Sequence, residues 1–204
     1  MHRIYLEQGK KRVFACSLDW PGWCRVDKTD KLAIARLVDY TERYRIIADR
    51  AGVAFDSREP TVVATIDGGA TTDFGAPEKQ APADLEPVPK ELAERDVKLM
   101  RAAWEVFDEA VAASPEELRK GPRGGGRDRT KMVAHVTEAE RNYARNVGIR
   151  HRPYKSEADR DAMRAELARV YEKEGEFKWA PRYAVRRVVW HVIDHLWEME
   201  DRRE

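Results

Sequence analysis

The sequence has little cysteine, no long apolar run and almost no net charge, and each of these features excludes a class of protein. Its two cysteines, Cys16 and Cys24, have a spacing that matches no zinc or redox motif. We therefore expect two reduced structural thiols and no disulfide framework. The first residues, MHRIYLEQGKKR, lack the apolar core of a signal peptide, and no run approaches the roughly 20 apolar residues of a membrane span. We expect a cytoplasmic protein without a membrane partner.

An excess of one charge is also missing. The chain has 38 lysines and arginines against 37 aspartates and glutamates, a formal net charge of +1, and neither half of the chain is basic. A nucleic-acid-binding domain usually carries a basic excess, so we expect no nucleic-acid partner. The length of 204 residues is enough for two compact domains, each with its own core.

The first part of the chain has strand-like and then helical patterning. Apolar and polar positions alternate over residues 3–8 and 12–19, with GKK between them as a turn. A helical period follows over residues 30–50, and TVVATID at 61–67 is typical of a further strand. We therefore expect a small β-β-α-β module over residues 1–69.

The rest of the chain divides into a linker and helices. Residues 70–89 are rich in proline and glycine and show no period, which is typical of a linker or a long ordered crossing. Residues 90–204 then show helical periodicity, and four helices of about twenty residues with short or moderate connections predict a four-helix bundle. The four helices are expected over residues 90–114, 128–148, 156–175 and 181–203. The expected fold class is therefore α+β.

The last predicted helix carries two histidines four positions apart, His191 and His195. Positions with this spacing differ by about 40° around a helix, so both imidazoles project from one side, at or near its apolar arc. His135 lies on the inward arc of an earlier helix. Three neutral imidazoles suit zinc, nickel, iron or copper and leave a coordination position for water or substrate. On the last helix, the arc opposite the histidines holds Arg186, Arg187, Asp194, Glu198 and Asp201.

The histidines also have a simpler interpretation, as hydrogen-bonded core residues, and the other histidines favour no site. His2 lies at a terminus, and the loop position of His151 indicates exposure to solvent. Glu138 lies about 60° from His135 around its helix, which favours a surface salt bridge. Asp194 and Glu198 are expected at the surface or behind a ligand, where a carboxylate orients an imidazole.

Three segments resemble the DinB/YfiT-like superfamily of metal-binding four-helix bundles. They are HVTEAERNY at 135–143, the final RRVVWHVIDHLWEMEDR at 186–202, and ATTDFGAP at 70–77. The resemblance implies that His135, His191 and His195 form a metal triad, with zinc or nickel as the expected ion. It also implies a reaction on a small-molecule substrate, either a transfer or isomerisation with a low-molecular-weight thiol or a metal-dependent hydrolysis. Homodimers are common in this superfamily.

The first module is similar to the HicB-like fold, through RVFACSLDWPGWCRV at 12–26 and the helix that follows. This resemblance implies an interaction or substrate-covering role. An alternative function is therefore a non-catalytic binding or regulatory protein whose first module contacts a partner or a second copy. The loop GPRGGGRDR at 121–129 is either a flexible linker or a source of arginines for an acidic substrate. The candidate arginines are Arg123, Arg127, Arg129 and the more distant Arg182.

Overall fold

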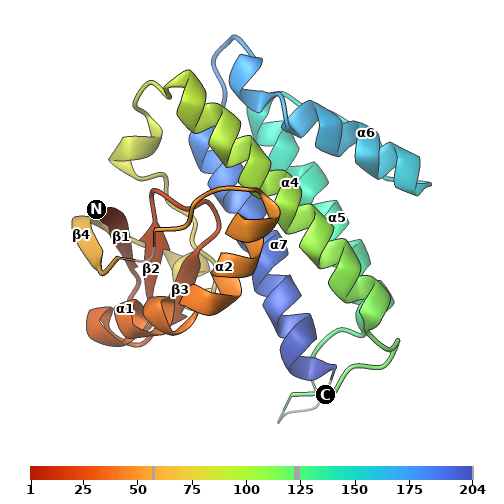
Figure 1. Ribbon diagram of the computed structural model, residues 1–204, viewed down its shortest axis with the longest axis horizontal. Coiled ribbons are helices and arrows are strands. Elements are labelled where there is room, and N and C mark those ends of the chain that lie inside the picture. The colour runs from red at the N-terminus through yellow and green to blue at the C-terminus, as the bar shows by residue number, and fades with distance from the viewer. Residues whose placement is uncertain (57, 122–124, 204) are drawn as a thin grey trace.

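The computed structural model describes residues 1–56, 58–121 and 125–203. A four-stranded sheet built from the first third of the chain lies beside several helices built from the remainder (Figure 1). The structure is thus mixed, with the strands early in the sequence and the long helices after them, as expected.

The sheet has the strand order β3-β2-β1-β4. Its strands are β1 (His2–Gln8), β2 (Val13–Ser17), β3 (Cys24–Asp27) and β4 (Pro60–Asp67). Neighbours β1, β2 and β3 are antiparallel, whereas β4 is parallel to β1 and forms an edge. All residues of β2 are buried, because both of its faces are covered. The apolar residues of β2 belong to two hydrophobic clusters, one on each face.

Two details of the first module differ from the β-β-α-β prediction. Strand β3 was not predicted, because its four residues follow a Pro-Gly turn and are too few and too exposed to show alternation. The helix expected over 30–50 is two helices, α1 (Asp30–Asp39) and α2 (Thr41–Arg50). They separate at Tyr40, where the Thr41 hydroxyl donates to the carbonyl of Val38 at 2.6 Å and competes with the helical pattern.

The segment between strand β4 and the long helices is an ordered crossing. It contains α3 (Ala70–Phe74) and a short 3-10 helix, η1 (Pro82–Asp84). The buried carboxylate of Glu7 in β1 holds this segment by accepting hydrogen bonds from the Thr72 hydroxyl at 2.6 Å and the Glu78 amide at 2.9 Å. The segment therefore packs on one face of the sheet and leads directly into the helices.

The helical part has four longer helices, α4 (Lys90–Ala113), α5 (Arg129–Ala144), α6 (Glu157–Leu167) and α7 (Pro181–Arg202), with short 3-10 helices η2 (Arg145–Val147) and η3 (Val170–Glu172). Helices α4 and α5 pack against α7, and α6 packs against α5. Ser156 caps α6 with its side chain, and Pro181 begins α7, both as expected. Helix α6 ends at Leu167, eight residues before the expected stop at Gly175.

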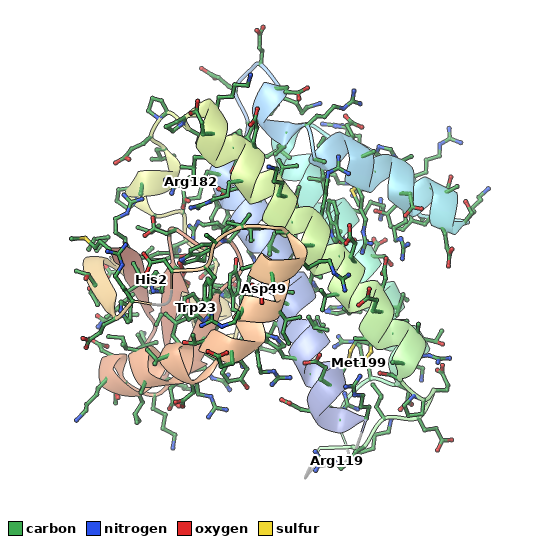
Figure 2. All side chains as sticks on the ribbon, in the orientation of Figure 1. His2, Trp23, Asp49, Arg119, Arg182 and Met199 are labelled. Carbon is green, nitrogen blue, oxygen red and sulfur yellow. The ribbon has the colours of Figure 1, made fainter. Side chains whose placement is uncertain are left out.

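Helix α7 lies between the sheet and the other helices and is buried on nearly all sides. Arg182 and Met199, toward its two ends, are both buried (Figure 2). Trp190 packs on one face of the sheet with Tyr5 and Phe14. The helical wheel placed Arg186 and Arg187 opposite the histidines, yet both are buried. Arg186 contacts Asp84 and Tyr5, whereas Arg187 packs on Tyr143 of α5.

The remaining expectations for the first module concern its thiols and its membrane contacts. Cys16 and Cys24 are buried free thiols that face each other across β2 and β3. Within the described residues, no helix combines the length and apolar character needed to cross a membrane.

Candidate metal centre

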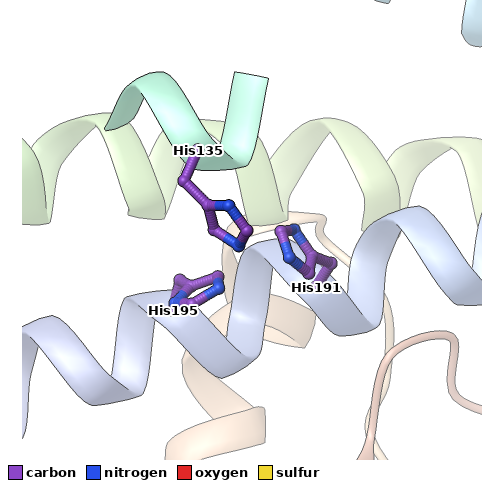
Figure 3. A group of neighbouring side chains, drawn as sticks. All are labelled: His135, His191 and His195. Atoms are coloured by element: carbon purple, nitrogen blue, oxygen red, sulfur yellow. The ribbon is translucent and has the colours of Figure 1, made fainter. Parts of the chain in front are cut away.

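The structure brings His135, His191 and His195 together. One ring nitrogen of each lies within 4.8 Å of a ring nitrogen of the others. Ring centroids are 5.0 Å apart for His135 and His191, 4.9 Å for His135 and His195, and 4.6 Å for His191 and His195. Figure 3 shows the three imidazoles converging, one from α5 and two from successive turns of α7.

Helix α5 is fixed in rotation by its buried side. Met132 and Val136, which flank His135 in sequence, are fully buried. About one turn further on, the buried carboxylate of Glu140 accepts a hydrogen bond from Trp104 Nε1 of α4 at 2.5 Å and one from Arg164 Nε of α6 at 3.2 Å. These contacts hold α5 against two helices and keep His135 directed at α7.

Helix α7 is fixed in rotation from its other side. The buried guanidinium of Arg186 pairs with the buried carboxylate of Asp84 in η1. Farther along the helix, Arg25 of β3 donates to Asp194 at 3.0 Å. Since both pairs lie on the side that faces the first module, His191 and His195 face α5.

Two of the three imidazoles, those of His135 and His191, are held in the form that binds metal. Desolvation, followed by electrostatic interaction with His195 and Arg127, lowers the pKa of His135 to about 4. Desolvation and the neighbouring His195 and Arg187 lower the pKa of His191 well below its ordinary value. Both side chains are therefore neutral near pH 7, and a neutral imidazole has the lone pair that a metal ion needs.

Hydrogen bonding also leaves nitrogens free for an ion. His195 Nδ1 lies 2.8 Å from Oε2 of Glu198, so its Nε2 remains available. Desolvation raises the pKa of Glu198, but hydrogen bonds from His195 and Arg202 lower that pKa overall. The carboxylate beside the His195 imidazole is therefore charged. His191 Nδ1 is buried without a hydrogen-bond partner among the described residues.

The spacing of the nitrogens is compatible with a tetrahedral ion. Zinc binds imidazole nitrogens at about 2.0–2.1 Å, which places the nitrogens of one site about 3.4 Å apart. Nitrogens within 4.8 Å of one another reach that spacing through small side-chain rotations. Three such ligands fit zinc or another late first-row metal and leave a fourth position open.

The other titratable residues named from the sequence lie outside this cluster. The half-exposed carboxylate of Glu138 pairs with Arg141 of α5, which agrees with the expected salt bridge. His151 is partly exposed and lies 3.0 Å from a carboxylate oxygen of Glu166. His2 is more buried than its position at the terminus suggested, because its ring stacks on Trp23 at 4.6 Å.

The arginines named from the sequence separate into two groups. Arg129 donates to the carbonyl of Ser114 at 2.7 Å, and Arg182 donates to the carbonyls of Leu18 and Ala83, so both stabilise the fold. Arg127 is exposed, and its charge is near enough to lower the pKa of His135 and His191. Arg123 lies outside the described residues.

Arg187 is a residue near the site that sequence reasoning missed. Its guanidinium contacts the rings of Tyr143 and Trp190, which also pack against His191. The signal was present in the sequence, since Arg187 lies four positions before His191 and so on a neighbouring stripe of the same helix.

A large hollow lies elsewhere, among η1, the start of α4, η3 and the start of α7. Its volume is about 870 Å³, and Leu85, Val97, Tyr171 and Arg182 are among its lining residues. None of the three histidines lines it. The hollow and the histidine cluster are therefore separate features of the molecule.

Comparisons of this chain with protein-family models, with curated proteins and with solved structures gave no match. The geometry of the histidine cluster is thus the main guide to function.

Proposed function

We propose that this protein binds a divalent transition metal ion, zinc or nickel, through His135, His191 and His195. The observation that carries the proposal is the convergence of three imidazole nitrogens within 4.8 Å. Their burial, the lowered pKa values of His135 and His191, and the carboxylate of Glu198 behind His195 support it.

We further propose that α4 to α7 form a four-helix bundle of the DinB/YfiT-like type. This proposal is supported by the resemblance of residues 135–143 and 186–202 to that superfamily and by the packing of α4 and α5 on α7. The short length of α6 and the sheet beside α7 depart from a regular bundle.

In the enzymatic form of this proposal, the site transfers or isomerises a small substrate with a low-molecular-weight thiol, or hydrolyses it. A bound divalent ion supplies Lewis acidity that lowers the pKa of a coordinated water or thiol. The chain's own residues would hold the ion, and burial keeps the imidazoles of His135 and His191 neutral. Cys16 and Cys24 are buried in the first module, so a thiol that reaches the site would come from a cofactor.

A second candidate is a non-catalytic binding or regulatory protein, and exposed apolar side chains favour it. Leu32 and Val38 of α1, Ile46 of α2, and Val62 and Val63 of the edge strand β4 are each at least 40% exposed. Apolar surface of this kind on the first module suits contact with a partner or with a second copy. In this case the metal has a structural role.

The first experiment is metal analysis by plasma mass spectrometry on untagged protein after incubation with zinc or nickel. Wild type is compared with a His135→Ala, His191→Ala, His195→Ala variant, and a His151→Ala variant is the matched control. We expect near-stoichiometric metal in wild type and in the control, and none in the folded triple variant. Equal trace metal in all three proteins would mean that the histidines are core residues.

A further inference from the structure

Five arginines are buried in the described part of the chain, and Arg187 differs from the other four. Arg141 pairs with the carboxylate of Glu138 on its own helix, and Arg164 and Arg186 pair with carboxylates of other elements. Arg182 donates to two backbone carbonyls. Arg187, only 8% exposed, has no carboxylate of a described residue within ion-pair distance, and its Nη1 is buried without a partner among these residues. A buried charge without a partner is costly.

Aromatic rings hold the faces of this guanidinium. Its Cζ lies 4.4 Å from the ring centroid of Trp190 and 4.8 Å from that of Tyr143. Stacking of this kind restrains the plane of an arginine but uses none of its N–H groups, which point outward in that plane. Arg187 therefore retains donors in the geometry that binds a carboxylate or a phosphate through two parallel hydrogen bonds.

The same two rings connect Arg187 to the histidine cluster. The ring of Tyr143 lies 5.6 Å from the ring of His191, edge to face, and that of Trp190 lies 5.9 Å from it. Arg187 and His191 are also one turn apart on α7, a rise of about 6 Å. An unpaired cation and the proposed metal ligands thus share one aromatic environment.

We propose that Arg187 binds an anionic oxygen group, a carboxylate or a phosphate, of a small ligand that also reaches the metal on His135, His191 and His195. This inference rests on the proposed function and adds the substrate class to it. The exposed Arg127, on the loop that leads into α5, adds a second positive charge near the cluster. On the side of His191, the two arginines thus favour an anionic ligand, whereas the charged carboxylate of Glu198 lies behind His195.

A different partner for Arg187 is a buried water. A cavity of about 20 Å³ between α7 and the sheet borders Arg187, Tyr183 and Trp190. That volume holds one water and is too small for a carboxylate. A water there would satisfy Nη1 without neutralising the charge, and Arg187 would then be a structural residue.

The test uses the full chain loaded with cobalt(II), whose visible spectrum reports ligands that enter the coordination sphere. Inorganic phosphate and succinate are titrated separately, because their relative affinities distinguish a phosphate site from a carboxylate site. The variants are Arg187→Gln and Arg187→Lys, with Arg36→Gln, an exposed arginine on α1, as the control. Metal content is measured for every protein.

We expect all four proteins to take up cobalt equally. In wild type and in R36Q at least one anion changes the spectrum, whereas R187Q binds it about tenfold to a hundredfold more weakly. R187K keeps the charge but lacks the planar guanidinium, so we expect a smaller loss of anion affinity than in R187Q. If R187Q does not fold, the test uses R187K instead.

Two results would overturn the inference alone. One is normal metal loading with equal anion affinity in wild type and R187Q, and the other is a loaded wild type that responds to neither anion. Absence of metal from wild type after loading would instead overturn the proposed function, and this inference with it.

Discussion

Two adjacent arginines, Arg186 and Arg187, show how differently the two sides of α7 are built. Arg186 faces the sheet and η1, where Asp84 and the Tyr5 hydroxyl accept its hydrogen bonds. Arg187 is equally buried but finds only aromatic faces among the described residues. On the sheet side, therefore, the chain supplies the counter-charge for its own buried cation, whereas on the side of the histidines it does not.

The histidines follow the same contrast. The ion pairs Arg186–Asp84 and Arg25–Asp194 fix the position of α7, and both partners of each pair belong to the chain. The nitrogens of His191 and His195 that lack protein partners, together with Arg187, form a group of polar atoms that the described residues leave incomplete. Buried polar groups are normally satisfied, so an incomplete group is a better indicator of a binding site than a complete one.

The largest expected effect comes from removing one partner of the buried Arg186–Asp84 ion pair. Asp84→Ala leaves Arg186 buried without its counter-charge, and we expect the free energy of unfolding to fall by about 3–5 kcal/mol. Urea denaturation measures it. Asp201→Ala removes an exposed partner of Arg43 and should cost less than about 1 kcal/mol. Equal losses in the two variants would contradict the distinction between buried and exposed pairs.

The next largest effect is the gain in stability on zinc binding at the three histidines. Free zinc at about 100 times its dissociation constant should raise the free energy of unfolding of wild type by about 2.7 kcal/mol, because the metal binds the native state. The variant that lacks His135, His191 and His195 should show no such gain in the same urea titration. A gain of similar size in that variant would mean that zinc binds elsewhere.

Glu198 offers a smaller and more selective change. Glu198→Gln removes the carboxylate charge that accepts a hydrogen bond from His195. We expect the affinity for zinc to fall about tenfold to a hundredfold while the fold persists. Competition with a chromophoric chelator measures the affinity. Glu200→Gln, on the same helix but paired with Arg43, is the control and should leave zinc affinity unchanged.

The smallest effect is the pH dependence of the metal-free protein. Below about pH 6.5 an unfolded histidine binds a proton, whereas native His135 does so only near pH 4. The unfolded state thus binds more protons in this range, and stability should fall as pH decreases from about 6.5 to 4. Denaturation at a series of pH values should give a smaller slope for His135→Asn than for wild type.

The proximity of His191 and His195 could be predicted from local geometry, whereas the approach of His135 was expected from its inward position and from the resemblance to the DinB/YfiT-like superfamily. A spacing of four positions puts His191 and His195 on one side of any helix, and the buried neighbours of His135 set its direction. The limits of α4 and α7 were predicted to within one residue, since proline and apolar periodicity mark them.

The rest depends on contacts that sequence patterns do not carry. From the sequence, two adjacent arginines are expected to face solvent. Arg186 is buried because it pairs with Asp84, 102 positions earlier in the chain, and Arg187 is buried against Tyr143 of another helix. Strand β3 forms because β2 is present as its partner, not because its four residues alternate. The break at Tyr40 likewise depends on packing, since its ring contacts Trp197 of α7.

The position of α7 between the sheet and the other helices has a consequence for folding during synthesis. This helix supplies residues to both hydrophobic clusters and carries two of the three converging histidines. Before α7 is synthesised, the sheet and α4 to α6 lack the helix that packs on both, although α2 already contacts α4. The core and the cluster of three histidines are therefore incomplete until α7 is present, and a nascent chain without it contains one histidine of the three.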